Sequence, residues 1–311
     1  MNHASPRQSG MTTTEVLIMA SIMSVLMIMI TESMTTLSSV RHEQQTRFKV
    51  ADVADRVARQ IDKDLQFASR IFCNNVEDNQ FLSRLDLATP LKAPNHRLPT
   101  LTDRGYFEPD ASTVETGNVL FLARRGPKLM VDLQDEGNFL FDSLQFIVYA
   151  PVADGDGLEL IRWASDLMLN YWDVAEIDDL AVRSDVLMQL EESGVMYAWD
   201  PLAPASGALW DLVGGILTPL TTNDMVLGAE DPMNSRPFGE RSMQIAENGW
   251  SNTIKVPAFT TANGAFPGGF ELRADGSTAG KLILLRLVAR STKANIGDVG
   301  REIRRFFYAN G

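Results

Sequence analysis

A single acidic residue, Glu15, stands directly before an apolar stretch that runs from Val16 to Ile30. A carboxylate at the edge of a lipid-facing segment is costly unless it has a partner. Taken alone, the position of Glu15 leaves three partners open: a lipid headgroup, water, or another protein. The carboxylate therefore indicates recognition chemistry at this end of the chain.

The residues needed for common catalytic and metal chemistry are scarce. The three histidines are His3, His42 and His96, and two of them lie near the N-terminus, which leaves little material for a histidine-based catalytic or zinc site. No G-x-S-x-G or H-E-x-x-H motif occurs. We therefore expect a protein that is not an enzyme and that needs no cofactor.

One acidic turn could offer oxygen ligands to Ca²⁺. Asp154 and Asp156 alternate with glycines between two strand-like runs, and Glu159 follows them. The calcium-loop pattern requires a third acid at regular spacing, which is absent here, so a solvated β-hairpin is favoured. Whether Asp154 and Asp156 bind calcium stays open.

Other polar and reactive residues favour structural roles. The pair Arg124-Arg125 precedes Gly126-Pro127 and is interpreted as a turn flank rather than an anion site. Cys73 is expected to be a small buried apolar group, and as the only cysteine it cannot form an internal disulfide. An acidic run is interpreted as an exposed face and consists of Asp173, Glu176, Asp178 and Asp179. The tryptophans are interpreted as core or interface anchors and are Trp163, Trp172, Trp199, Trp210 and Trp250.

Composition is that of a folded protein with an acidic surface. The 311 residues are 45% hydrophobic and 22% charged, which is ordinary for a globular chain. The formal charge of −12 argues against a nucleic-acid surface, since such a surface needs clustered Lys and Arg. We expect no nucleic acid among the direct partners.

The element that must position Glu15 is a long helix. The apolar run extends through mild flanks to cover residues 11–40, which is enough to span a bilayer. From Phe48 to Phe72 apolar residues recur at gaps of three and four, which predicts a one-sided helix over residues 41–73. No Gly or Pro interrupts Met11 to Phe72, so one helix of about 93 Å is predicted. A cleaved secretory signal peptide is disfavoured because the helical pattern continues past the apolar run.

Strand-like runs in the rest of the chain, residues 74–311, predict a mostly antiparallel β domain, so the expected fold class is α+β. Residues 74–116 are rich in proline and are expected to be loops, and Asp185–Trp199 is ambiguous between helix and strand. Residues 200–280 are rich in Gly, Pro, Asn and Ser and are expected to hold short strands at best. The predicted strands are Asn118–Ala123, Lys128–Leu133, Leu140–Ala150, Leu158–Ala164, Ile254–Phe259, Gly269–Arg273, Lys281–Ser291 and Arg301–Ala309.

The N-terminal stretch "G-MTTTE-VLIMASIMSVLMIMI" resembles the class III leader of type IV pilins and type II secretion pseudopilins. In that family a prepilin peptidase cuts after a glycine, and a glutamate is the fifth mature residue. Gly10 matches the last residue of a leader spanning residues 1–10, Met11 the first mature residue, and Glu15 the glutamate. Methionine replaces the usual phenylalanine, and the leader has one basic residue where several are common. The body is similar to J-type pseudopilins and PilW-like minor pilins through "ARQIDKDLQFASRIF", "LQFIVYA…LELIRWA" and "RRFFYANG".

This resemblance implies a function in assembly. The chain would be a minor pilin or pseudopilin with a pilin-like fold, single-pass in a bacterial inner membrane with residues 74–311 extracytoplasmic, and then part of a pilus or pseudopilus. Its partners would be the prepilin peptidase, other minor subunits, membrane lipid and the assembly platform. Glu15 would pair with the free α-amine of a neighbouring subunit, whereas capping of its own helix is the simpler alternative.

Two observations leave alternatives open. Positive charges after the apolar run outnumber the one before it, so counting charges alone favours the opposite orientation. A membrane-anchored adhesin or binding protein also fits a helix followed by a β domain, and a membrane-anchored hydrolase fits less well because a nucleophile–base set is missing.

Overall fold

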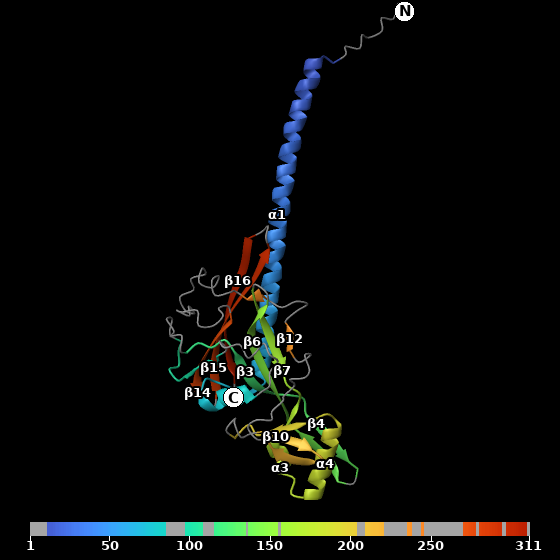
Figure 1. Cartoon of the computed structure of the whole chain (residues 1–311), viewed down its shortest axis with the longest axis vertical. Coiled ribbons are helices and arrows are strands. Elements are labelled where there is room, and N and C mark those ends of the chain that lie inside the picture. Colours follow the sequence, from blue (N-terminus) through green and yellow to red (C-terminus); the bar gives the residue numbers. More distant parts are fainter. Residues whose placement is uncertain are drawn as a thin grey trace, which may run out of the picture.

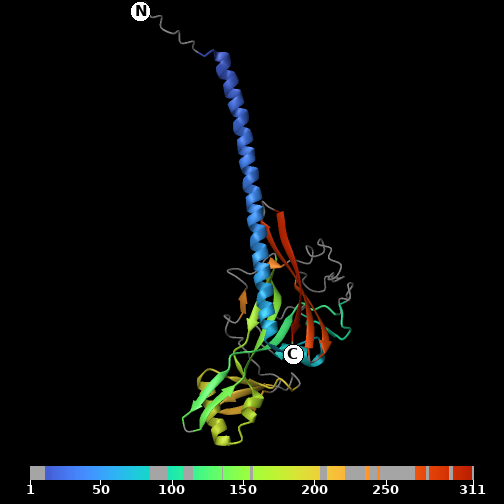
Figure 2. The same ribbon diagram turned by 180° about the vertical axis from the view of Figure 1, so that it is seen from behind.

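The computed structural model describes residues 11–84, 97–107, 115–134, 136–154, 157–203, 209–220, 235–237, 244–245, 270–277, 280–293 and 297–309. It shows one long N-terminal helix followed by a mostly antiparallel β domain (Figure 1). The predicted α+β fold class is confirmed at this level. The helix projects from one end of the β domain, and a smaller lobe lies at the other end (Figure 2).

The long helix α1 spans Thr13–Gln66, which is 54 residues or about 81 Å. The prediction of an unbroken helix to Phe72 is wrong. Phe67 is the C-cap, and strand β1 (Ala68–Ile71) then pairs with β3 (Leu120–Arg125). The apolar residues at Ala68 and Phe72, which seemed to continue the helical stripe, are buried as residues of the strand and its end. Residues at these positions would be buried in a helix or in a strand, so the apolar pattern alone did not show where the helix ends.

The two halves of α1 have different surroundings. Residues 13–42 are exposed all round, whereas from Thr46 onward one face is buried. This face packs on the sheet mainly through β15 (Gly280–Lys293), β16 (Gly297–Ala309) and β3, as Figure 2 shows from behind. Its buried apolar members are Val50, Ala54, Val57, Ala58, Ile61 and Leu65. The spacing of three and four residues in the sequence predicted this face correctly.

The main sheet is curved around the second half of α1. Its strands near α1 are β1, β2 (Leu101–Thr102), β3 (Leu120–Arg125), β6 (Ser143–Asp154), β7 (Gly157–Ala164), β12 (Ser235–Pro237), β13 (Gln244–Ile245), β14 (Phe270–Ser277), β15 (Gly280–Lys293) and β16 (Gly297–Ala309). Four further strands, described below, continue the same sheet from β6. The pairs β6–β7, β14–β15 and β15–β16 are antiparallel neighbours in sequence. The hairpin predicted at Asp154 is confirmed, since Asp154 pairs with Gly157.

Alternate residues of the central strands fill two cores on opposite faces of the sheet. Leu120, Leu122 and Tyr149 belong to the core that covers α1. Phe121 and Phe146 belong to the opposite core, where Phe72 stacks on Phe121 with ring centroids 3.9 Å apart. Period-two alternation therefore places every second side chain of β3 and β6 on the helix.

A third core belongs to a group of elements that we call the accessory lobe (residues 129–141 and 168–219), and four of its strands continue the main sheet from β6. It contains β4 (Leu129–Leu133), β5 (Gly137–Phe141), β8 (Met168–Asn170), α3 (Tyr171–Ala175), α4 (Leu180–Glu192), β9 (Tyr197–Trp199), β10 (Leu209–Val213) and β11 (Ile216–Pro219). In Figure 1 the lobe lies at the end of the molecule opposite the N-terminus.

Several sequence predictions need correction. The run Leu140–Ala150 is two strands, because the chain leaves β5 at Phe141 and enters β6 at Ser143. The stretch expected to be loop contains helix α2 (Val76–Arg84). The ambiguous segment before Trp199 is helix α4 and then strand β9. Ile254–Phe259 lies outside the described residues.

The buried face of α1 predicts which soluble fragment folds. A fragment 47–311 retains ten buried apolar side chains that a fragment 74–311 lacks, six of them in α1. Burial of each Val, Leu, Ile or Phe among them contributes about 1.5–3 kcal/mol, so the loss is comparable with a whole domain's stability of about 5–15 kcal/mol. We expect 47–311 to unfold cooperatively in urea and 74–311 to show no cooperative transition by circular dichroism. A folded, cooperative 74–311 would contradict the role of α1 in the core.

Candidate functional site

The N-terminal end of α1 is closed by a capping box between Thr12 and Glu15. The Glu15 backbone N–H donates to the Thr12 hydroxyl oxygen at 3.4 Å. In return the Thr12 backbone N–H and its hydroxyl both donate to Oε2 of Glu15, each at 2.9 Å. The alternative role that the sequence left open for Glu15, capping of its own helix, is therefore present in the single chain.

Capping does not use the whole carboxylate. Both recorded bonds go to Oε2, and an ionised carboxylate can accept hydrogen bonds at both oxygens. Within the described residues, Oε1 of Glu15 is thus open to a second donor from outside the chain. Met11 lies beside the cap and is 57% exposed, whereas Gly10 lies outside the described residues. A single chain does not test the pairing expected between Glu15 and a neighbouring subunit.

The surface that follows Glu15 is apolar on every side. In the most apolar 18-residue window of α1, mean hydropathy is 2.0 and none of the surface is buried within the chain. Hydroxyls on this surface bond back to the helix: Ser24 donates to the Ala20 carbonyl and Thr31 to the Met27 carbonyl, both at 2.8 Å. These bonds satisfy the polar groups internally, as lipid requires. Among the described elements, α1 is long and apolar enough to cross a membrane.

The second half of α1 is fixed to the sheet by one buried carboxylate. Asp64 is completely buried, and its side chain accepts four hydrogen bonds from three residues of the sheet. Arg124 of β3 donates at 2.6 Å, Arg162 of β7 at 2.8 and 3.3 Å, and the Tyr149 hydroxyl of β6 at 2.5 Å. We call these four residues the Asp64 anchor.

The charges of the neighbouring arginines determine the protonation state of the Asp64 carboxyl. Burial alone raises the pKa of the Asp64 carboxyl, but the hydrogen bond and charge of Arg162, the Tyr149 hydroxyl and the charge of Arg124 outweigh it. The pKa of Asp64 therefore lies below its ordinary value, and Asp64 is ionised at neutral pH. Burial and the charge of Asp64 raise the pKa of Tyr149 well above its ordinary value.

Sequence reasoning missed this anchor. Arg124 was expected only to flank a turn, yet it is a strand residue that pairs with a helix residue sixty positions earlier. The available signal was an aspartate among the apolar positions of the stripe, since Asp64 directly precedes the buried Leu65. An ion pair of α1 with β16 adds a second, more exposed link, in which Arg305 donates to Asp55 at 3.4 Å.

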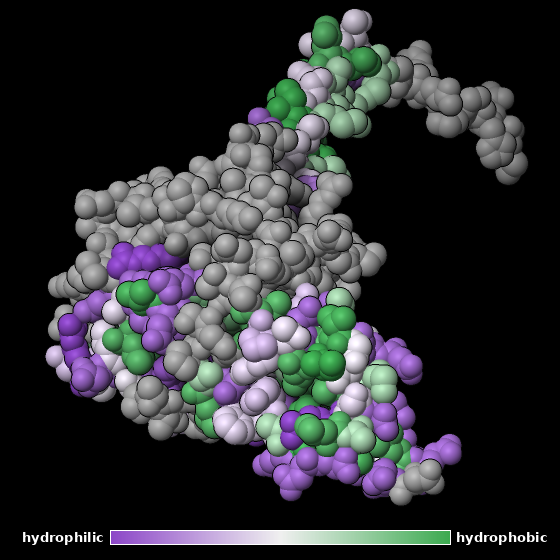
Figure 3. Space-filling view, turned by 60° about the horizontal axis from the view of Figure 1, so that its bottom comes forward, coloured by the Kyte–Doolittle hydropathy of each residue, from purple (hydrophilic) through white to green (hydrophobic). Residues whose placement is uncertain are grey.

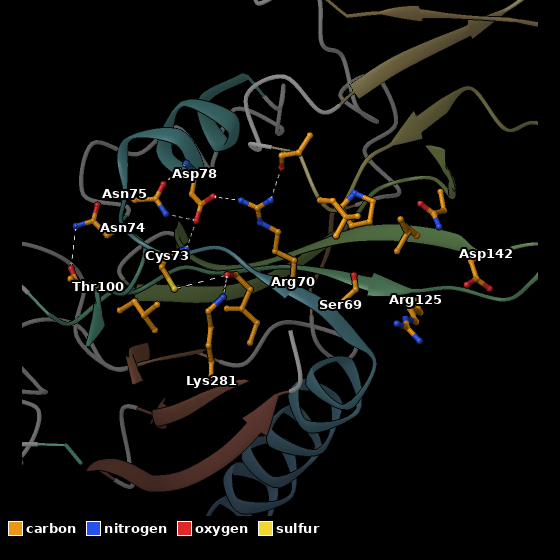
Figure 4. Close-up of a pocket in the computed structure, with 17 residues that line it drawn as sticks. Ser69, Arg70, Cys73, Asn74, Asn75, Asp78, Thr100, Arg125, Asp142 and Lys281 are labelled. Carbon is orange, nitrogen blue, oxygen red and sulfur yellow. Dashed lines mark hydrogen bonds and ion pairs between the residues drawn. The ribbon is translucent and has the colours of Figure 1, made fainter. Parts of the chain in front are cut away.

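A cleft of about 830 Å³ lies where β1 leads into α2, next to the accessory lobe (Figure 4). Asp78 organises one wall of the cleft. Its carboxylate accepts from the Cys73 backbone N–H at 2.8 Å, the Asn75 amide at 2.8 Å and Arg70 at 3.1 Å. Lys281 is buried and donates to the Ile71 carbonyl at 2.8 Å. These bonds hold the helix–strand junction together.

The polar groups of this cleft are not arranged as a nucleophile and its base. Cys73 is buried as predicted, and burial raises the pKa of its thiol to about 11, so the thiol stays protonated and unreactive at neutral pH. Asp78 is committed to structural donors. Within the described part of the chain, no group of three or more His, Cys, Asp or Glu residues could hold a metal ion. Asp156 lies outside the described residues, so the question of calcium at Asp154 and Asp156 is untested.

The predicted tryptophans and acidic residues that the structure describes lie in the core, in local structure or at the surface, while Trp250 and the side chain of Trp163 lie outside the described residues. Trp199 is fully buried, Trp210 is half-buried and Trp172 is partly exposed. In the acidic run, Asp179 is the N-cap of α4 and Asp173 accepts from the Asp142 backbone N–H at 2.6 Å. The run is therefore partly structural, while Glu176, Asp178 and Asp179 are exposed.

Comparison of the chain with models of known protein families, with characterised proteins and with solved structures found no match.

Replacement of Asp64 by Asn should destabilise the protein, because Arg124 and Arg162 would keep their charges with no carboxylate between them. Loss of one partner from a buried ion pair costs about 3–5 kcal/mol. Because the pKa of Asp64 is lowered in the folded state, its contribution is complete above the ordinary value of 3.8 and is lost as the pH falls through the folded pKa. The deficit of Asp64→Asn should therefore shrink at acid pH.

Urea unfolding of the full chain in detergent, from neutral pH to about pH 3, measures this dependence. Asp52→Asn on the same helix is the matched control, because Asp52 and its partner Arg56 are exposed; its effect should stay within about 0.5 kcal/mol. A pH-independent deficit for Asp64→Asn would show that the loss is one of packing rather than charge.

Proposed function

We propose that this protein is a minor pilin or pseudopilin, processed between Gly10 and Met11 and assembled through α1 into the tip or shaft of a type IV pilus or type II secretion pseudopilus. The observation that carries this proposal is the division of α1. Its first half is apolar on all sides and packs on no other element among the described residues, whereas its second half is built into the β domain. The first half of such a helix can leave a bilayer and enter a helix bundle while the β domain stays folded.

The geometry around Glu15 supports the same proposal. Cleavage after Gly10 would create an α-amine at Met11, next to the positive end of the α1 dipole, where a positive charge is unfavourable. A carboxylate from a neighbouring subunit would relieve this repulsion. Since the cap occupies Oε2 alone, Glu15 could cap its own helix and accept an α-amine at Oε1 at once.

Processing can be tested directly. In cells with an active prepilin peptidase, we expect the membrane-extracted protein to begin at Met11, with a formal charge of −13 after loss of Arg7 from the −12 chain. Gly10→Leu should accumulate uncleaved precursor, because a bulky side chain should not fit the peptidase. Intact-mass spectrometry measures both. An uncleaved wild-type N-terminus in those cells would refute the assignment to this family.

Two substitutions separate the roles of Glu15. Glu15→Gln removes the charge but retains an oxygen that can cap the helix, whereas Thr12→Ala removes the reciprocal hydroxyl and retains the charge. Pairing with an α-amine predicts that Glu15→Gln reduces co-purification of other minor subunits by about tenfold or more, with cleavage and membrane insertion unchanged. Thr12→Ala should leave co-purification nearly intact.

The opposite pattern would restrict Glu15 to capping. If tagged Glu15→Gln recovers every partner as well as wild type does, the pairing role fails for this chain. A subunit at the tip has no subunit ahead of it, so the partner to quantify first is the one that follows it in the filament.

A further inference from the structure

The cleft between β1, α2 and the accessory lobe, which we call the junction cleft, contains a buried lysine without a counter-ion. Lys281, the second residue of β15, lines the cleft and is only 7% exposed. Lysine is almost never buried unless its ammonium is paired. Among the described residues, no carboxylate forms an ion pair with Lys281. Its Nζ donates to the neutral Ile71 carbonyl at 2.8 Å, which uses one of three N–H groups. The charge and two donors therefore remain for a group from outside the chain.

The acidic groups nearest to Lys281 do not balance its charge. The charge of Lys281 acts on the Cys73 thiol, but burial outweighs it and raises the pKa of this thiol to about 11, so Cys73 stays neutral. The Asp78 carboxylate accepts instead from Arg70, from the Cys73 backbone N–H and from the Asn75 amide. This end of the cleft is therefore positive.

The charged residues that line the whole cleft leave a positive excess. They are Arg70, Asp78, Arg125, Asp142 and Lys281. Both carboxylates have a cation of their own, since Arg70 lies 3.1 Å from Asp78 and Lys128 lies 3.3 Å from Asp142. The two remaining charges are cationic, and neither forms an ion pair with a described residue. Arg125, which was expected only to flank a turn, is exposed, and Figure 4 shows it and Lys281 toward opposite ends of the lining residues.

The size and walls of the cleft suit a small molecule. Its volume of about 830 Å³ lies in the usual range for small-molecule sites, about 300–1,000 Å³. The walls are joined across the cleft, because Arg70 of β1 donates to the Ala203 carbonyl of the accessory lobe at 3.1 Å. Leu101 and Leu144 add apolar surface to the lining. Because Lys281 is so deeply buried, a small ligand can contact its ammonium whereas a flat protein surface cannot.

The surroundings of the cleft do not attract anions in general. The accessory lobe, residues 129–141 and 168–219, contains twelve acidic residues and one basic residue, a formal charge of −11 against −12 for the whole chain. Figure 3 shows hydrophilic side chains over much of this end of the molecule. Because the field of the lobe repels negative charge, an anion at the cleft must be held by close contacts rather than by the net charge of the protein.

We propose that the junction cleft binds a small organic anion whose carboxylate or phosphate group contacts the ammonium of Lys281. Arg125 adds positive charge at the other end of the cleft. The proposal does not rest on the proposed function, because the cleft is formed by the β1–α2 junction and the lobe and includes no residue of the exposed half of α1.

The test measures binding of matched anionic and neutral compounds to the full chain in an uncharged detergent. The anions are succinate, which carries carboxylates, and glycerol 3-phosphate; succinamide and glycerol are their neutral counterparts. Isothermal titration calorimetry at constant ionic strength should show at least one anion binding with a Kd below about 1 mM, and its neutral counterpart at least about tenfold more weakly. The anion with the lower Kd identifies the group that Lys281 prefers.

Substitutions locate the anion. Lys281→Met removes the ammonium but keeps an unbranched apolar side chain, and it should weaken binding about tenfold or more. Lys63→Met is the matched control, because Lys63 is an exposed lysine of α1 that does not line the cleft. Arg125→Gln alters an exposed side chain and should weaken binding about threefold. Urea unfolding checks that each variant is folded; if Lys281→Met is not, Arg125→Gln and the neutral compounds still decide.

Three results would overturn the proposal: no binding of either anion at up to about 10 mM, equal binding of an anion and its neutral counterpart, or an unchanged affinity in folded Lys281→Met. Equal binding of the neutral compound would show that the cleft does not select charge. An unchanged affinity in Lys281→Met would place the anion elsewhere on the protein. None of these results bears on cleavage at Gly10 or on Glu15.

Discussion

Burial of one face of α1 is the constraint on which the rest of the structure depends. An isolated amphipathic helix gains little from its own hydrogen bonds, so the apolar face from Val50 to Leu65 must be covered. The curved sheet supplies that cover with alternate side chains of its strands. The Asp64 anchor then fixes where the helix lies, since a buried carboxylate with three sheet partners tolerates neither a shift nor a rotation.

The same helix leaves its other half exposed to solvent. Because α1 continues without a break across the edge of the β domain, its apolar first half is held on a rigid rod about 45 Å long over residues 13–42. Lipid and other apolar helices are the environments that suit such a surface. The position of the Asp64 anchor near the far end of α1 means that forces on the exposed half are transmitted to the sheet through a buried, charged contact rather than through a flexible linker.

The accessory lobe has a core of its own, and its strands β8–β11 continue the main sheet from β6. The side chains of this third core pack between α3, α4 and short strands, whereas Met168, Trp199 and Leu209 of the lobe belong to a core of the main sheet. The lobe also carries most of the net negative charge, so the molecule combines an apolar end at α1 with an acidic end at the lobe.

Local patterns in the sequence determined the long helix, its one-sided second half, the β6–β7 hairpin and the two final strands, because helical and strand periodicity are encoded by neighbouring residues. They did not determine that α1 ends at Gln66, since Ala68 and Phe72 are buried in either backbone. Nor did they reveal the Asp64 anchor or an accessory lobe built from two separate stretches of chain. Asp64 meets its partners across sequence separations of 60, 85 and 98 residues, so only the tertiary structure could bring those charges together.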